Sequence, residues 1–265
     1  MIESPTTYRV VSLGKLRLQE AWRVELLHSQ PRHRLYWITR GQGRVTIRGI
    51  TRGYGPNTAI FLPAGTQAAL ELSAQLQGME LGLPIEAALE LPTEPFHIRV
   101  ATPEAQTSLT GHLEKTEREL SGQAPAMARA LKGYGLLIST WITRELDRAE
   151  GAVIRKKSHK LIELYAQAVE AKFRNGHNVA DFAAQLGVTP THLSRLCREA
   201  SGKPAHALLV ERVMQEACRL LRDTDMPARE VAQTLGFSSA AYFTRAFHQA
   251  TDLTPSEFRA APRRP

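Results

Sequence analysis

The spacing of hydrophobic positions changes near residue 102, from alternation with polar residues to a helical repeat of three and four. Before that point the apolar runs are short. Turn residues separate them, as in Gly-Pro-Asn at 55–57 and Pro-Ala-Gly at 63–65. Short strands joined by such turns are typical of a sandwich or barrel. We therefore predict that residues 8–100 form a small β-domain of this kind.

Two features of the predicted β-domain define its strands further. An alternating run places Val24, Leu26 and His28 on one face of a predicted strand. Two more runs, in RLYWITRGQGRVTIRGI, flank the Gly-Gln-Gly sequence at 41–43. Glycines between two alternating runs predict a β-hairpin at that position.

A pair of helices is predicted after the change in spacing. Thr102 can cap a helix that has Pro103 in its first turn and extends to about residue 120. A second helix is predicted over 126–149 and has one apolar stripe, formed by Leu131, Ile138, Trp141, Ile142 and Leu146. The stripe fits either packing within the chain or a dimer contact between helix pairs. Residues 151–160 are predicted to be a linker.

Two similar helical units follow, in VADFAAQLGVTPTHLSRLCREASGKP and AREVAQTLGFSSAAYFTRAFHQATDLTP. In each, a short helix ends at Leu-Gly, and a polar residue then caps a second helix. The predicted cap, stop and second cap are Asn178, Gly187 and Thr189 in the first unit and Asp225, Gly236 and Ser238 in the second. This pattern predicts two helix-turn-helix units, whose second helices fit the major groove of DNA.

An amphipathic helix is predicted between the two units, over residues 205–223. Its apolar positions are Leu209, Val213, Ala217, Leu220 and Leu221. A rigid helix of this length would fix the distance between the units and could present them to successive major grooves, about 34 Å apart.

Composition agrees with an anionic partner. The chain has 265 residues, enough for about two domains, and a formal net charge of +8. From Lys156 onward there are 16 Lys and Arg against 11 Asp and Glu, so most of the excess lies in the C-terminal part. Such a balance is compatible with nucleic acid or an anionic membrane surface. Cys197 and Cys218 occupy apolar helical positions and are predicted to be reduced core thiols. Without a signal peptide or an apolar run of about 18 residues, we expect a cytoplasmic protein that does not span a membrane.

The segment 178–259 resembles the DNA-binding domain of the AraC/XylS family of bacterial transcription regulators. The motifs that support this resemblance are LGVTPTHLSRLCREASGKP, ERVMQEACRLL and VAQTLGFSSAAYFTRAFHQATDLTPSEFR. Residues 8–100 resemble, less specifically, the cupin-like domain often found ahead of it. The resemblance implies an α+β protein of two domains, with a regulatory domain at 1–100, a helical pair at 101–150 that could dimerise, and a DNA-binding domain at 161–262.

The resemblance also implies roles for individual residues. Those expected to contact base edges are Thr191, Ser194 and Arg195 in the first unit and Ala240, Ala241, Tyr242, Thr244 and Arg245 in the second. Those expected to contact phosphates are Thr189, Arg198, Ser238, Ser239 and His248. Arginine can bind guanine through two hydrogen bonds, and Ala or Thr can meet a thymine methyl group. The implied partners are double-stranded DNA, a small organic effector, a second copy of the chain and, for an activator, RNA polymerase.

Two sets of residues in the β-domain invite other interpretations. His28 and His33 could suggest a metal site, but a site needs three or four converging ligands, and Gln67 and Ala68 stand where related sequences often have histidine. We therefore predict neither a metal nor a cofactor. The aromatic residues of this domain fit either a ligand pocket or the core; they are Trp22, Tyr36, Trp37 and Tyr54.

Three functions remain open from the sequence. The first is a DNA-binding regulator, not an enzyme, with an effector in the N-terminal domain. The second is a metal-dependent cupin enzyme with a helical appendage, and the third is a regulator controlled by a protein partner. The missing ligand set and the double motif favour the first.

Overall fold

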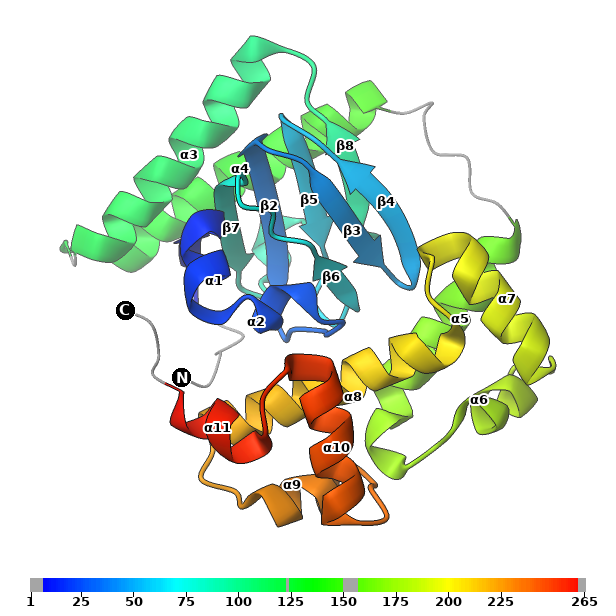
Figure 1. The fold of residues 1–265 in the computed structure, drawn as a ribbon. Helices are drawn as coiled ribbons and strands as arrows, with labels where there is room; N and C mark the ends of the chain where they lie inside the picture. The colour runs from blue at the N-terminus through cyan, green and yellow to red at the C-terminus, as the bar shows by residue number, and fades with distance from the viewer. Residues whose placement is uncertain (1–6, 123, 150–156, 262–265) are drawn as a thin grey trace.

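The computed structural model describes residues 7–122, 124–149 and 157–261. It shows a β-rich part, within residues 7–149, followed by a helical part, residues 157–261 (Figure 1). The strands are β1 (Arg9–Ser12), β2 (His33–Arg40), β3 (Gly43–Ile47), β4 (Ile50–Tyr54), β5 (Thr58–Leu62), β6 (Ala68–Leu70), β7 (Gln77–Leu83) and β8 (Phe96–Arg99). The helices are α1 (Leu13–Glu20), α2 (Trp22–Glu25), α3 (Pro103–Gly122), α4 (Met127–Ala149), α5 (Lys157–Lys172), α6 (Val179–Gln185), α7 (Pro190–Ser201), α8 (Ala205–Asp223), α9 (Ala228–Thr234), α10 (Ala240–Thr251) and α11 (Pro255–Ala260).

The β-rich part is a sandwich of two antiparallel sheets within the described residues. The larger sheet has the order β1-β7-β2-β5-β8 and the smaller one β4-β3-β6. Alternate residues of β2 point to opposite faces, so Tyr36 and Ile38 join the core with Val45 and Tyr54 of the smaller sheet. Their burial confirms the predicted sandwich, and the helices that follow confirm the α+β class.

The prediction of strand structure at residues 13–25 was wrong, because this segment forms α1 and α2. The hydroxyl of Ser12 accepts a hydrogen bond from the Lys15 amide (3.2 Å) and begins α1. Leu13 and Leu16, three positions apart, bury the inner side of that helix. His28 is in extended backbone, but it forms only an isolated bridge with Ala68 among the described residues.

The hairpin predicted at 41–43 was also wrong. β2 pairs with β5 and β7, whereas β3 pairs with β4 and β6, so this turn leads from one sheet to the other. Gly41 is required there because its φ is +91° and an added Cβ would lie 2.8 Å from the Leu76 Cα. The tight hairpin instead joins β3 to β4 through Arg48 and Gly49, both with positive φ.

Helices α3 and α4 cover the outer face of the larger sheet (Figure 1). The helix start at Thr102 and Pro103 is confirmed. The apolar stripe of α4 is buried within this chain, and the Trp141 indole donates to the Ala105 carbonyl at 2.9 Å. Of the two interpretations, packing within the chain is therefore the correct one. Leu136 and Leu137, on the other side of α4, are 42% and 49% exposed.

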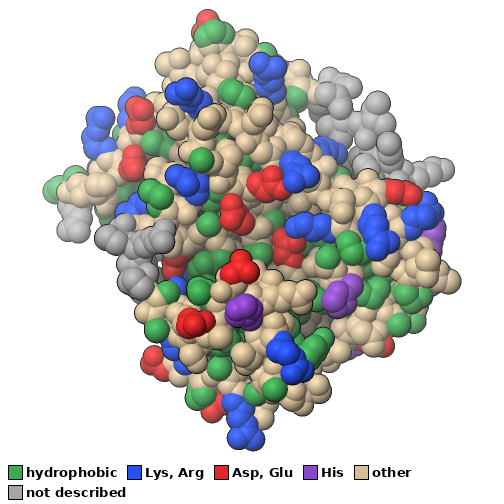
Figure 2. All heavy atoms as spheres, in the orientation of Figure 1, with side chains coloured by type: hydrophobic (Ala, Val, Ile, Leu, Met, Phe, Trp, Pro, Cys, Tyr) green, Lys and Arg blue, Asp and Glu red, His purple; other side chains and the backbone are tan. Residues whose placement is uncertain are grey.

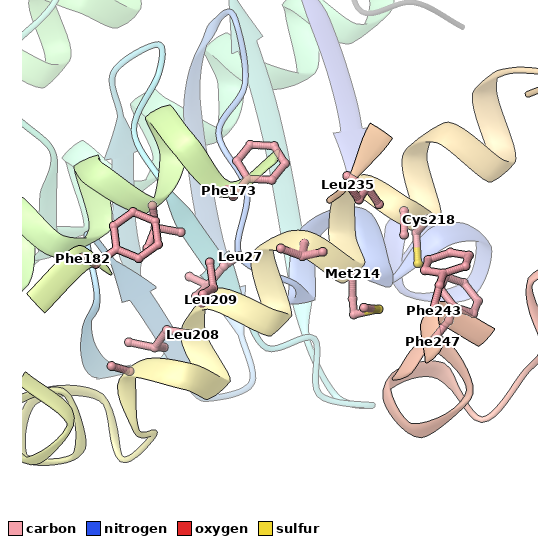
Figure 3. Packing of buried hydrophobic residues seen from close by; sticks show 14 of the residues in the cluster. Leu27, Phe173, Phe182, Leu208, Leu209, Met214, Cys218, Leu235, Phe243 and Phe247 are labelled. Carbon is pink, nitrogen blue, oxygen red and sulfur yellow. The ribbon is translucent and has the colours of Figure 1, made fainter. Parts of the chain in front are cut away.

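The helical part packs around α8. Phe182, Met214, Phe243 and Phe247 belong to one core that includes both helix-turn-helix units (Figure 3). The expected amphipathic helix over 205–223 is confirmed by α8. Burial raises the pKa of the Cys197 and Cys218 thiols to about 11 and about 12, so both behave as core side chains, as predicted.

The β-rich part packs directly against the helical part. Leu27 and Ala69 are members of the helical core, and Trp22 packs edge-on against Phe258 at 5.9 Å. The Arg23 guanidinium forms two hydrogen bonds with the Asp223 carboxylate, at 2.6 and 3.0 Å. Of the predicted linker, residues 151–156 lie outside the described residues and 157–160 belong to α5.

Candidate nucleic-acid interface

The first helix-turn-helix unit consists of α6, α7 and the turn between them. The Asn178 side chain accepts from the Ala180 amide at 2.8 Å, and Asp181 completes a reciprocal cap at the start of α6. Gly187 ends that helix with φ at +69°. The Thr189 hydroxyl accepts from the His192 amide at 3.2 Å and begins α7, as predicted.

The second unit, α9 to α10, has the same turn with different caps. Gly236 has φ at +76°, as a helix stop requires, but the cap of α10 is Ser239, not Ser238. The Ser239 hydroxyl accepts from the Tyr242 amide at 3.2 Å. Asp225 does not cap α9, which begins at Ala228 after Pro227. A proline disfavours helical backbone at the residue before it, which here is Met226. The helix therefore begins too far along the chain for Asp225 to cap it.

The outer face of α7 presents the predicted contact residues of the first unit. Thr191, Arg195 and Arg198 are exposed and Ser194 is half-buried, while Leu193 and Leu196 are buried behind them. This arrangement follows from the helical repeat, which separates the two faces. Thr189 is exposed at the start of the helix.

The Arg195 side chain is held by two neighbours that sequence reasoning missed. Its guanidinium forms an ion pair with Glu199 at 2.5 Å and a hydrogen bond with His192 Nδ1 at 3.3 Å. The i+4 and i−3 spacings of these residues were the available signal. The side chain is still 58% exposed, so its remaining N–H groups face solvent.

The outer face of α10 is less polar. Ala240, Ala241, Arg245 and His248 are exposed, Tyr242 is 51% exposed, and Thr244 is half-buried, with Phe243 and Phe247 buried behind them. The Thr244 hydroxyl donates to the Ala240 carbonyl at 2.9 Å, so its proton is engaged within the helix. Ser238 and Ser239 are exposed at the helix start. Arg245 is the cation among these predicted base contacts.

Helix α8 relates the two units to each other. Figure 1 shows α6 and α7 toward its N-terminal end and α9 and α11 toward its C-terminal end. The Arg259 side chain donates to the Leu221 carbonyl at 3.1 Å, and Arg222 donates to the Ala261 carbonyl at 2.7 Å.

On the face seen in Figure 2, basic and acidic side chains are interspersed, so surface charge does not define the interface. The candidate interface is therefore defined by the caps and exposed faces of α7 and α10.

The two histidines singled out in the β-rich part have separate partners. His28 is buried; its Nδ1 donates to the Leu26 carbonyl at 2.8 Å and its Nε2 accepts from Arg34 at 2.7 Å. Burial, together with the Arg34 charge, holds the pKa of His28 well below its usual value, so the ring is neutral. His33 instead accepts from the Ala64 amide at 3.2 Å. The described residues contain no group of three His, Cys, Asp or Glu side chains that could hold a metal ion.

The four aromatic residues do not line one pocket. Tyr36 and Tyr54 lie in the core between the sheets, whereas Trp37 faces α3 and donates to the Thr110 hydroxyl at 2.9 Å. Trp22 packs on the helical part. The core interpretation is correct for Tyr36, Trp37 and Tyr54. None of the described helices is both long and apolar enough to cross a bilayer.

Comparison with known proteins gives a family match for the helical part. A model described as a helix-turn-helix domain matches residues 182–261. The arabinose operon regulatory protein of Salmonella typhimurium is 28% identical over 147 residues, 54% of this chain and 52% of that protein. The regulator ExsA of Pseudomonas aeruginosa is 30% identical over 108 residues, 41% of this chain and 39% of ExsA. The chain thus spans about half or less of the length of these relatives.

A shorter relative is matched over most of its length. The probable transcription factor PqrA of Proteus vulgaris is 32% identical over 84 residues, 32% of this chain and 69% of PqrA. Among solved structures, fatty-acid-bound ToxT of Vibrio cholerae aligns with 98% of this chain and 97% of its own, at 11% identity and a TM-score of 0.47. The paired units, the match over 182–261 and the relation to PqrA show that this chain belongs to the AraC/XylS family of transcription regulators.

Proposed function

We propose that this protein is a sequence-specific DNA-binding transcription regulator whose β-rich part receives the regulatory signal. The supporting observation is the pair of capped helices α7 and α10, each with a buried inner face and an exposed outer face, joined through the buried α8. Such helices fit successive major grooves. The proposed division has a regulatory domain at 1–100, a helical pair at 101–150 and a DNA-binding domain at 161–262.

The proposed contacts divide into two groups. Base edges are read by Thr191, Ser194, Arg195, Ala240, Ala241, Tyr242, Thr244 and Arg245. Phosphates are bound by Thr189, Arg198, Ser238, Ser239 and His248. In the first group Arg195 is the main source of specificity, because α10 has few side chains that can hydrogen-bond to bases.

The remaining assignments follow from this function. A regulator of this class acts on chromosomal DNA in the cytoplasm and is not an enzyme. We propose that it acts as a homodimer and, as an activator, contacts RNA polymerase. The exposed Leu136 and Leu137 of α4 are the proposed dimer surface, because the stripe on the other side of this helix is buried.

Genome-wide mapping of bound DNA tests the proposal. Wild-type protein should enrich sites that contain two half-sites about 10 base pairs apart, one turn of the duplex. A variant with Arg195→Ala and Arg245→Ala should lose those sites while keeping its thermal stability, because both side chains are exposed. The proposed function would be contradicted if wild-type protein enriched no such sites, or if the variant enriched the same sites as wild type.

A further inference from the structure

A cavity of about 580 Å³ lies between the β-rich part and the helices α5 and α8. Residues 28–31 and Gly65 form one wall, and side chains of α8 form the other. The volume is within the range of sites for small organic molecules. Among its fifteen described lining residues, all except Pro31, Gly65 and Phe173 have a polar or charged group in the side chain.

Hydrogen bonds join the two parts, and one of them, between Ser29 and Glu170, lies in the wall of this cavity. The Glu170 carboxylate, on α5, accepts from the Ser29 hydroxyl at 2.6 Å and from the Gln67 amide at 3.4 Å, both in the β-rich part. The Leu27 amide donates to Glu211 of α8 at 3.2 Å. A molecule in the cavity would therefore touch both parts and the helix that joins the two helix-turn-helix units.

Two of the lining arginines are fully engaged. Arg212 binds both oxygens of Glu170, at 2.8 and 2.9 Å, and stacks over the Phe173 ring at 3.8 Å. Arg23 binds both oxygens of Asp223. Within each pair the positive and negative charges balance, so the remaining charged side chains of the lining decide what the cavity can bind.

Arg174 and Arg219 share one carboxylate, that of Glu216. Arg174 donates to it at 2.6 Å and Arg219 at 2.8 and 3.1 Å, while Arg212 lies 3.8 Å away. Glu216 is 3% exposed, whereas the two arginine side chains are 52% and 40% exposed. With His28 neutral, four guanidinium groups face three carboxylates among the described lining residues, an excess of one positive charge.

Uncharged polar side chains also line the cavity. They include Ser29, Gln30, Gln215 and Thr224. Hydroxyl and amide groups can both donate and accept hydrogen bonds, so they suit the hydroxyl groups of a bound molecule.

We propose that this cavity binds a small hydroxylated organic anion, with its acidic group on Arg174 and Arg219 and its hydroxyl groups among the uncharged polar side chains of the lining. Carboxylates and phosphates both fit the spare N–H groups of these two arginines. The ligand would link the β-rich part to α8, and as an effector it rests on the proposed regulatory function. The site is distinct from the interior of the sandwich, where Tyr36, Ile38 and Tyr54 pack.

Isothermal titration calorimetry and thermal unfolding of the full, DNA-free chain test this site. The probes are gluconate and glucose 6-phosphate, which separate a carboxylate from a phosphate source, with glucose as the uncharged match and hexanoate as the unhydroxylated one. We expect saturable binding of gluconate or glucose 6-phosphate, with a raised Tm. Glucose and hexanoate should bind at least about tenfold more weakly, since they lack the charged or the hydroxyl contact.

Arg174→Gln with Arg219→Gln should weaken anion binding about tenfold or more. Arg129→Gln with Arg229→Gln, at exposed positions of α4 and α9 outside the cavity, is the charge-matched control and should bind as wild type. Failure of both anions to bind, equal binding of glucose or hexanoate, or an unchanged double variant would overturn the proposal. Mobility shift with DNA in the same preparations reports separately on the proposed regulatory function.

Discussion

The Arg195 side chain is exposed and is also held in place by two neighbouring residues. Glu199 and His192 hold its guanidinium on the outer face of α7, which reduces the side-chain freedom that DNA binding must remove. Glycine and cap positions of this unit followed from the sequence because they depend on local backbone geometry alone. The two partners of Arg195 were missed because a recognition motif identifies positions on a helix and not the contacts among its own side chains.

Replacement of Arg195 by Ala is expected to weaken binding at one half-site by about 1–3 kcal/mol and to relax base preference there. The reason is the loss of bidentate hydrogen bonding to a base edge. Fluorescence anisotropy with the operator and single-base variants measures both effects. Arg229→Ala, on α9, serves as the control for lost positive charge. Unchanged affinity together with unchanged preference would refute the assignment.

The cap of α10 gives a second residue-level prediction. Ser239→Ala should lower the free energy of unfolding by about 0.5–2 kcal/mol, because the Tyr242 amide loses its acceptor. Ser238→Ala is the matched control and should change stability by less than about 0.5 kcal/mol, since this residue lies outside the cap. Urea unfolding of both variants distinguishes the two serines. Equal losses of stability in the two variants would contradict the assignment of Ser239 as the cap. The sequence prediction was wrong by one residue because either serine fits the capping pattern.

At the level of elements, periodicity predicted the long helices well and the segment 13–25 poorly. The helices α3, α4 and α8 have enough turns for their apolar stripes to be unambiguous. The short α1 and α2 do not, and their burial depends on tertiary contacts. The error at 41–43 has a similar origin. Gly41 lies close to Leu76 and Gly43 lies close to Tyr54, and only the folded chain reveals these contacts.

The two sides of α4 should respond differently to substitution. Leu137→Glu is expected to convert a dimer to a monomer in analytical ultracentrifugation without lowering Tm, because Leu137 is 49% exposed. Leu18→Glu, at a 55% exposed position of α1, is the matched control and should remain dimeric. Trp141→Glu should instead unfold the protein, since it would bury a charge in the core. A Leu137→Glu protein that stays dimeric would exclude this surface.

For the whole molecule, the net charge of +8 favours a strongly salt-dependent interaction with DNA. Neutralised phosphates release counterions, so log K should fall linearly with log salt concentration, with a slope of about −0.9 for each phosphate contact. Arg198→Ala should reduce the slope by about one while weakening all sequences equally, because a phosphate contact does not read bases. Anisotropy titrations between 50 and 200 mM salt, about the range over which such effects are large, provide the measurement. A flat response would argue against DNA as the partner.

Docking of the β-rich part on α8 could not be read from the sequence, because it joins residues as far apart as Arg23 and Asp223. Arg23→Ala should loosen this contact, since it leaves the largely buried Asp223 carboxylate without its bidentate partner, at a cost of about 1–3 kcal/mol. Arg44→Ala, which breaks an exposed pair with Glu71, should cost less than about 1 kcal/mol. Hydrogen exchange should then increase at residues 21–30 and at the end of α8 only in the Arg23 variant. Equal exchange in both variants would mean that this ion pair adds nothing to the docking. The remaining contacts, such as those of Leu27, Trp22 and Glu170, would then hold the two parts together.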